Sequence, residues 1–228
     1  MAIPHGVWSR AYADVVRATF RAAGELCITA GLVLLLFCAY LLWGTGAYTD
    51  REQPLLEQEL AREQADPGPQ GEDKPKRLKK IKLGHAVALL RIPRLGDDYK
   101  YAVIEGVTTE HLRKGPGHYP GTAMPGQTGN FVVSGHRTTY GAPFNEIDEL
   151  KRGDEIVVDA REARYTYRVT YHEVVLPTDL DVIAPVPGKP DRKPSKAFIT
   201  LTTCHPEYSA AQRYIVHGVL DRVELRKV

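Results

Sequence analysis

The chain has 228 residues, and its 30 Lys and Arg against 28 Asp and Glu give a formal net charge of +2. This length allows one ordinary domain with appendages. The near-neutral balance, without a concentrated basic stripe, argues against a nucleic-acid-binding protein. Composition alone indicates no activity.

An uncharged, largely apolar stretch lies near the N-terminus, with no charged residue from Leu26 to Thr49. About 20 apolar residues suffice for a helix to cross the hydrocarbon core of a bilayer. The stretch is longer than the apolar core of a signal peptide, and no clear cleavage site follows it. We therefore expect an uncleaved transmembrane signal-anchor at residues 26–49.

The orientation of this anchor is less strongly marked. Basic residues precede the span (Arg10, Arg17 and Arg21), and others follow it (Arg51 and Arg62). The positive-inside bias is therefore slight. We expect residues 1–25 to be cytoplasmic and the remainder to be extracellular, chiefly because the chemistry of the C-terminal domain requires it.

Residues 50–83 are strongly polar. Acidic residues dominate the first half, a basic run from Lys74 to Lys82 dominates the second, and Pro67–Gly71 separates the two. Leucines near position 56 allow a short helix, but little else in the stretch is able to bury a core. The segment predicts a solvated stalk or linker between anchor and domain.

From residue 84 to 228 the pattern becomes that of a mainly β domain. Short runs rich in Val, Ile, Tyr and Thr alternate with Gly, Pro and Asp clusters, which is typical of strands and turns. The predicted strands are Val87–Ile92, Tyr99–Ile104, Phe131–Ser134, Glu155–Asp159, Tyr165–Val175, Ala197–Cys204 and Arg213–Leu225. A single helical turn is expected within Phe144–Leu150. Seven or eight short strands with little helix predict a closed or nearly closed β-barrel.

Three residues at strand ends suggest a catalytic site. Cys204 ends one predicted strand and Arg213 begins the next, so antiparallel pairing through the short loop places both at one rim of the barrel. His136 joins them if its strand ends at the same rim. A thiolate is a nucleophile, an imidazole transfers protons, and a guanidinium stabilises a developing oxyanion.

Each of these residues has a structural alternative. Free cysteine is among the most buried residue types, so Cys204 is also compatible with a core position in a non-enzymatic, wall-binding β-domain. His217 is a rival base, but along the strand it lies roughly 13 Å from Arg213. His205 adjoins Cys204, so the two side chains diverge on a strand. No His or Cys pair has the spacing of a metal site.

The order His136, then Thr200-Leu201-Thr202-Thr203-Cys204, then Arg213 resembles the sortases. These are membrane-anchored cysteine transpeptidases of Gram-positive bacteria, and their histidine lies in a Gly-His context like that of Gly135-His136. The resemblance covers about residues 84–225 and implies an eight-stranded sortase barrel. It also implies Cys204 as nucleophile, His136 as general acid and base, and Arg213 as oxyanion and backbone clamp.

The resemblance further implies a substrate and a reaction. A C-terminal Leu-Pro-x-Thr-Gly-like sorting signal is cleaved between Thr and Gly, and the acyl group passes from Cys204 to an amine of the peptidoglycan precursor. By analogy Leu180, Val182 and Ile183 line the pocket for the first motif residues, and Thr203 borders the scissile carbonyl. The expected partners are surface proteins that carry the signal, the wall precursor and the membrane.

The subclass most similar to this chain is class E of actinobacteria, which favours Leu-Ala-x-Thr-Gly. Tyr119 is then expected to contact the second motif position, where its hydroxyl is able to pair with an alanine amide that proline lacks. No cofactor is expected, and a calcium requirement is left open. A pilin-polymerising sortase is the enzymatic alternative; an L,D-transpeptidase fails because Thr203, not glycine, precedes Cys204.

Overall fold

The structure is a computed structural model that describes residues 6–65 and 81–226. It separates into two compact units, Met1–Gly44 and Thr45–Val228. The predicted basic run from Lys74 to Lys82 lies outside the described residues except for its last two positions, 81 and 82.

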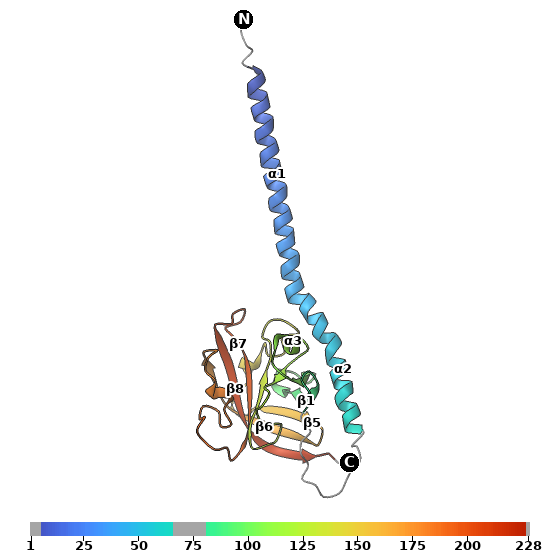
Figure 1. The fold of residues 1–228 in the computed structure, drawn as a ribbon, viewed down its shortest axis with the longest axis vertical. Helices are drawn as coiled ribbons and strands as arrows, with labels where there is room; N and C mark the ends of the chain where they lie inside the picture. Colours follow the sequence, from blue (N-terminus) through green and yellow to red (C-terminus); the bar gives the residue numbers. More distant parts are fainter. Residues whose placement is uncertain (1–5, 66–80, 227–228) are drawn as a thin grey trace. The chain divides into compact units, whose positions relative to one another are not determined.

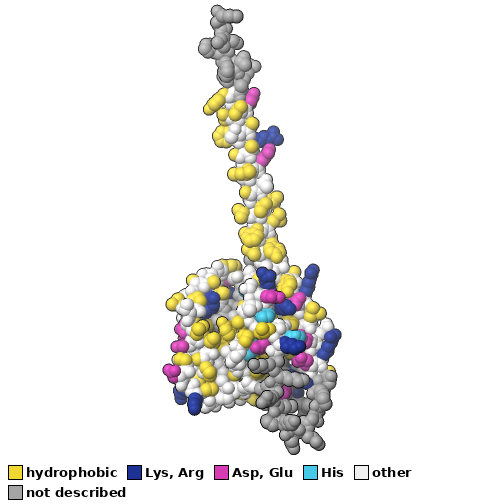
Figure 2. All heavy atoms as spheres, in the orientation of Figure 1, with side chains coloured by type: hydrophobic (Ala, Val, Ile, Leu, Met, Phe, Trp, Pro, Cys, Tyr) yellow, Lys and Arg dark blue, Asp and Glu magenta, His cyan; other side chains and the backbone are white. Residues whose placement is uncertain are grey.

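The first unit is helical. Helix α1 spans Gly6–Ala39 and continues into a short π-helical turn, η1, at Tyr40–Gly44. Its apolar side chains are exposed, as the hydrophobic surface of the helix in Figure 2 shows. Asp14–Ala39 is long and apolar enough to cross a membrane and has no buried residues, which fits a membrane anchor. The observed stretch overlaps the predicted span 26–49 but is shifted toward the N-terminus. Its first and last residues each lie about ten positions before those of the predicted span. Its orientation stays a prediction.

Helix α2, Thr45–Ala65, differs from the expected stalk. Its Leu56 and Leu60 are buried in a small apolar cluster with Ala86, Ala102 and Ile104 of the barrel. Burying these leucines against the sheet stabilises a helix whose sequence is otherwise polar. The helix therefore lies along the barrel beside strand β1 (Figure 1).

Gln53 fixes α2 to the second strand by a two-way contact. Its side-chain oxygen accepts from the Ala102 amide at 2.7 Å, and its Nε2 donates to the carbonyls of Ala102 (3.2 Å) and Lys114 (2.8 Å). The Gln53 side chain of the helix thus supplies hydrogen-bond partners for main-chain groups of Ala102 and Lys114. The predicted linker at residues 50–83 therefore includes, up to Ala65, a helix that is part of the folded unit.

The barrel is closed and contains eight strands within the described residues, which confirms the predicted fold class. In chain order the strands are β1 (Ala86–Arg91), β2 (Lys100–Glu105), β3 (Gly117–His118), β4 (Gly129–Ser134), β5 (Glu155–Ala160), β6 (Ala163–Val175), β7 (Ala197–His205) and β8 (Gln212–Leu225). Around the barrel they follow the order β1-β2-β3-β4-β7-β8-β6-β5. Strands β4 and β7 pair in parallel, and β8 is antiparallel to both β7 and β6.

Short helical turns join the strands. They are η2 (Pro93–Leu95), α3 (Thr109–Leu112), η3 (Ile147–Glu149) and η4 (Asp181–Ile183). The turn η3 falls within the predicted helical turn at Phe144–Leu150. Strand β3 was not predicted, because two residues in a Gly- and Pro-rich segment give no periodic signal.

The barrel interior is filled by alternate residues of the strands. Phe131 and Val133 of β4, Ile199 and Leu201 of β7, and Val216 of β8 belong to one buried core. Because side chains alternate across a strand, the residues between them face outward. Ser134, Thr202 and Cys204 therefore share the outer face of β4 and β7.

Candidate active site

Two of the three predicted catalytic residues, Cys204 and Arg213, lie on the neighbouring strands β7 and β8, and the third, His136, follows the end of β4 by two residues. In the register of β7 and β8, Cys204 lies directly opposite Arg213. In the parallel register of β4 and β7, Ser134 lies opposite Thr202. His136 lies two residues beyond Ser134 along the chain, as Cys204 lies two residues beyond Thr202 along β7. The parallel pairing thus leads the segment that carries His136 toward the end of β7 that carries Cys204.

Hydrogen bonds extend the β4–β7 pairing up to the histidine. The Gly135 amide donates to the Thr202 carbonyl at 3.1 Å, and the Thr203 hydroxyl donates to the Gly135 carbonyl at 2.8 Å. These bonds fix the backbone on both sides of the site.

The environment of His136 favours its neutral form. Burial, and after it the positive charge of Arg113, lowers the pKa of His136 from its ordinary value. The ring packs on Tyr140 with centroids 5.0 Å apart, and the Arg113 guanidinium lies 5.6 Å from the centre of the same Tyr140 ring. The Nε2 atom of His136 is buried and has no hydrogen-bond partner. A ring nitrogen without a hydrogen-bond partner is available for proton transfer.

Cys204 is a free, partly exposed thiol rather than a fully buried one. Arg213 turns its Nη1 toward the β7–β8 loop, where it donates to the carbonyls of Ala210 (3.0 Å) and Gln212 (2.9 Å). The backbone therefore brings Arg213 to the site, while these bonds anchor its guanidinium on the adjacent loop.

A second arginine, Arg137, was not identified from the sequence. Its side chain is only 6% exposed. Nη2 pairs with Asp148 at 2.6 Å, and Nη1 donates to His205 Nδ1 at 3.1 Å and lies 3.5 Å from the Cys204 carbonyl oxygen. The guanidinium also lies 5.8 Å from the centre of the Tyr214 ring.

Arg137 thereby ties the loop after His136 to the end of β7. Its neighbour in the chain is the predicted base, and it contacts the main chain of the predicted nucleophile. The sequence gives one signal for this role of Arg137, its position directly after Gly135-His136. The signal is weak, because an arginine in a turn is usually a surface cation.

Comparison with known proteins agrees with this geometry. A family model described as a sortase domain matches residues 90–221. Sortase SrtE1 of Streptomyces coelicolor is 35% identical over 210 residues, which cover 87% of this chain and 56% of that protein. The chain belongs to the sortase family.

Solved sortase structures show the same relationship. Sortase E of Streptomyces avermitilis is 42% identical with a TM-score of 0.58, covering 64% of this chain and 93% of that one. Sortase E1 of S. coelicolor, solved with a tripeptide in its active site, is 37% identical with a TM-score of 0.58. The match covers 63% of this chain and 92% of that one. The predicted resemblance to the sortases, and to their class E, is confirmed. This sortase spans 56% of the length of the curated SrtE1 protein.

The predicted substrate-binding residues of this sortase occupy different environments. Val182 is buried in η4, Ile183 is partly buried, and Leu180 is 62% exposed. Tyr119 directly follows β3, is partly exposed, and donates its amide to the Val132 carbonyl at 2.9 Å. Thr203 is buried, and its hydroxyl hydrogen is already donated to Gly135. Contact of these residues with a peptide stays a prediction.

The two rival histidines have other partners. His205 accepts from Arg137, as described above. His217 lies on the same face as Arg213 but four register pairs below it, opposite Thr200. Burial lowers the pKa of His217, while the hydrogen bond and charge of Glu173 oppose this shift. Neither histidine is level with Cys204.

Two further features bear on ligands. Among residues 6–65 and 81–226, no group of three or more His, Cys, Asp or Glu is arranged to hold a metal ion, and a calcium requirement stays open.

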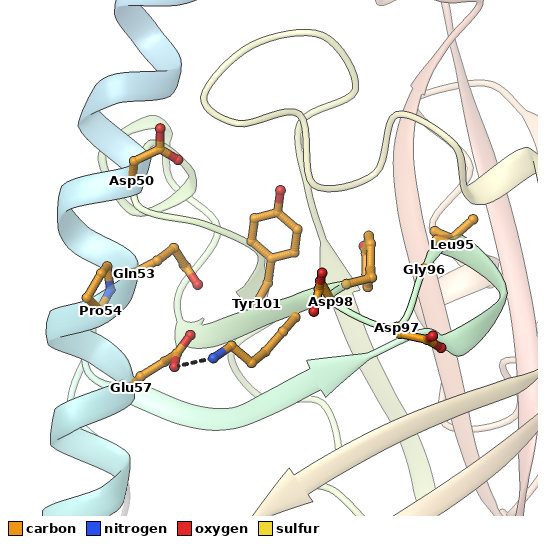
Figure 3. A pocket seen from close by; sticks show the side chains of 11 residues that line it. Asp50, Gln53, Pro54, Glu57, Leu95, Gly96, Asp97, Asp98 and Tyr101 are labelled. Carbon is orange, nitrogen blue, oxygen red and sulfur yellow. Dashed lines mark hydrogen bonds and ion pairs between the residues drawn. The ribbon is translucent and has the colours of Figure 1, made fainter.

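A cleft of about 450 Å³ lies between α2 and the η2–β2 segment (Figure 3). Asp50 and Asp97 are among its lining residues, and Lys100 in its wall pairs with Glu57 at 2.7 Å. None of the three predicted catalytic residues lines this cleft, so it is separate from the candidate active site.

Proposed function

We propose that this sortase is a transpeptidase that joins proteins carrying a sorting signal to an amine of the cell-wall precursor. The observation that carries the proposal is the pairing of Cys204 opposite Arg213 on β7 and β8, with His136 two residues beyond the end of β4, the strand that runs parallel to β7. Random placement of a thiol, an imidazole and a guanidinium would seldom produce such an alignment. It matches what acyl transfer through a thioester requires.

The proposed reaction has two halves. The sulfur of Cys204 attacks the threonine carbonyl of the signal, and its proton passes to His136. The C–N bond to glycine then breaks, the glycine amine takes that proton, and a threonyl thioester remains on Cys204. An incoming amine attacks the thioester, loses a proton to His136, and releases the thiol with a new amide bond.

Arg213 is proposed to stabilise the oxyanion of each tetrahedral intermediate. A guanidinium provides fixed donors and a permanent charge. Its present bonds are to carbonyls of the exposed β7–β8 loop. In the peptide complex we expect it to exchange at least one of these for the substrate.

The preferred signal is proposed to be Leu-Ala-x-Thr-Gly, on the strength of the similarity to class E sortases. The Tyr119 hydroxyl is proposed to accept a hydrogen bond from the amide N–H of the second motif residue, and Leu180, Val182 and Ile183 to contact the first residues. The catalytic unit is proposed to lie outside the cell, with α1 in the membrane and the N-terminus in the cytoplasm.

The proposal is tested with detergent-solubilised full-length protein, Leu-Ala-x-Thr-Gly and Leu-Pro-x-Thr-Gly peptides, and an amine acceptor, with products identified by mass spectrometry. We expect cleavage between Thr and Gly, transfer to the amine, and a higher kcat/KM for the alanine peptide. Tyr119→Phe should lower the alanine-to-proline ratio roughly tenfold, because an amide donor then lacks its partner. Tyr165→Phe, on β6, serves as the matched control.

Three results would change the proposal. Absence of any cleavage would leave a binding domain as the better interpretation. A preference for the proline peptide would remove the class E specificity. Efficient transfer to a pilin lysine but not to wall-precursor amines would favour a polymerising sortase.

A further inference from the structure

A chain of hydrogen-bonded polar side chains, buried except at its Glu173 end, crosses the outer face of the barrel below the catalytic rim. It consists of Asn130 on β4, Thr200 on β7, His217 on β8 and Glu173 on β6. Asn130, Thr200 and His217 are each at most 1% exposed. Buried polar groups cost stability unless each finds a partner. The partners of these groups show what the chain holds in place.

Asn130 attaches the turn η4 to the barrel. Its Nδ2 donates to the carbonyl oxygens of Val182 at 3.1 Å and Ala184 at 3.0 Å. Both carbonyls are only able to accept, so the amide nitrogen, and not the amide oxygen, must face the turn. The side chain uses both of its N–H groups on a segment that is more than 50 residues away in the chain.

The remaining bonds of η4 lie within the turn. Ile183 donates its amide to the Leu180 carbonyl, and the amides of Ala184 and Gly188 donate to the Asp181 carbonyl, at 2.9–3.1 Å. These bonds give the turn its shape but do not fix its position on the sheet. The two bonds from Asn130 connect it to β4, which is the strand that leads into His136.

Thr200 fixes the orientation of Asn130. The Thr200 hydroxyl oxygen lies 2.8 Å from Asn130 Oδ1, which is only able to accept, and 3.0 Å from His217 Nδ1. A hydroxyl has one hydrogen, so donation to Asn130 requires that Thr200 accept from His217 Nδ1–H. The His217 Nε2 atom faces Glu173 Oε1 at 2.9 Å. The bond to Thr200 therefore requires the Nδ1–H form of His217, and the contact with Glu173 requires a proton on Nε2 or on the carboxyl group.

We propose that Asn130, oriented by Thr200, is a positioning residue for recognition of the sorting peptide, because it holds the turn that carries Leu180, Val182 and Ile183. The inference rests on the proposed function, in which these three residues contact the peptide. Asn130 is six residues from His136 along β4 and takes no part in acyl transfer. Replacement of Asn130 is expected to weaken peptide binding more than it slows the chemical step.

Kinetics of the full-length protein in detergent provide the first test. Asn130→Leu removes both donors at nearly constant volume, and we expect KM for the preferred peptide to rise roughly tenfold or more, with kcat changed less than about threefold. Thr200→Val should shift KM in the same direction. Thr200→Ser, which keeps the hydroxyl, should restore a KM close to that of the wild type.

The chain offers a matched control for the threonine substitution. Thr166, on β6, is equally buried, but its hydroxyl has no hydrogen-bond partner. Thr166→Val therefore makes the same chemical change without breaking a bond, and it should leave KM and kcat unchanged. A similar rise of KM in Thr166→Val and Thr200→Val would attribute the effect to general packing and overturn the inference.

Hydrogen exchange provides a readout that does not depend on activity. The amides of Ile183, Ala184 and Gly188 report whether η4 is held, and they should exchange faster in Asn130→Leu and Thr200→Val than in Thr166→Val without any peptide. Unchanged exchange in the turn, or a fall in kcat at constant KM, would overturn the proposed role. If the wild type cleaves no sorting peptide, the proposed function fails, and the exchange rates still decide whether Asn130 holds the turn.

Discussion

Replacement of Arg137 by methionine tests whether the loop after His136 is held by a buried guanidinium. The substitution keeps the apolar stem but removes the ion pair with Asp148 and the donor to His205. A hydrogen bond to a charged group contributes about 1.5–3 kcal/mol, and the lower end applies here because the Asp148 side chain is 41% exposed and regains water. The bond to His205 adds about 1 kcal/mol.

One contribution has the opposite sign. The Nε atom of Arg137 is buried without a partner, and its removal returns about 1 kcal/mol. We therefore expect Arg137→Met to lower the free energy of unfolding by about 1.5 kcal/mol, or Tm by roughly 3–6 °C for a unit of this size. Thermal unfolding followed by the near-ultraviolet circular dichroism of the tyrosines measures this directly.

The control is Arg152→Met, which makes the same change at an exposed turn before β5. It should leave Tm within about 1 °C of the wild type, because surface substitutions rarely alter stability. Arg137→Met should also slow peptide cleavage, since the segment carrying His136 loses its tie to the end of β7. Equal Tm values for the two variants would refute the inferred role of Arg137.

Three further outcomes are expected. Arg213→Lys should lose about 10²–10³-fold in kcat, because an ammonium does not reproduce a forked pair of donors; near-normal turnover would mean that only charge is needed. Arg113→Gln removes a cation that lowers the pKa of His136, so the pKa rises and the limb of the pH–rate profile governed by His136 should move to higher pH; a shift to lower pH would contradict this electrostatic account. The full-length protein should stay in the membrane fraction after alkaline extraction with residues 1–49 intact, and N-terminal sequencing that began near Ala47 would instead indicate a cleaved signal peptide.

The barrel was predictable because most strands carry a strong local signal. Seven strands were expected within two residues of their observed ends, since β-branched and aromatic residues alternate with Gly- and Asp-rich turns. Strand β3 carries no such signal, because Gly117 and His118 are strand-like only through pairing with β2 and β4. Tertiary pairing, and not propensity, defines it.

Helix α2 illustrates a different limit. Its buried residues Gln53, Leu56 and Leu60 follow helical spacing, but the charged residues between them suggested a solvated linker. Whether an amphipathic segment packs on a domain or remains in solvent depends on a complementary surface. That surface is formed here by the apolar residues Ala86, Ala102 and Ile104, which are not recognisable as a docking site in the sequence.

The candidate site was predictable in its residue types and only partly in its geometry. The proximity of Cys204 and Arg213 follows from a short antiparallel connection. The position of His136 depends on the parallel pairing of β4 with β7, and these strands are more than 60 residues apart. Arg137 and Asn130 were missed because their roles depend on partners that lie far away in the chain.

The most direct test of the account is the mass of the enzyme captured during turnover. Full-length protein mixed with a Leu-Ala-x-Thr-Gly peptide, without an acceptor amine, should gain the mass of the fragment ending at threonine. Proteolytic mapping should place this adduct on Cys204, and Cys204→Ala should gain no mass while keeping its Tm. No adduct on the wild type, or an adduct on Cys27 or Cys38 of α1, would contradict the assignment of Cys204 as the nucleophile.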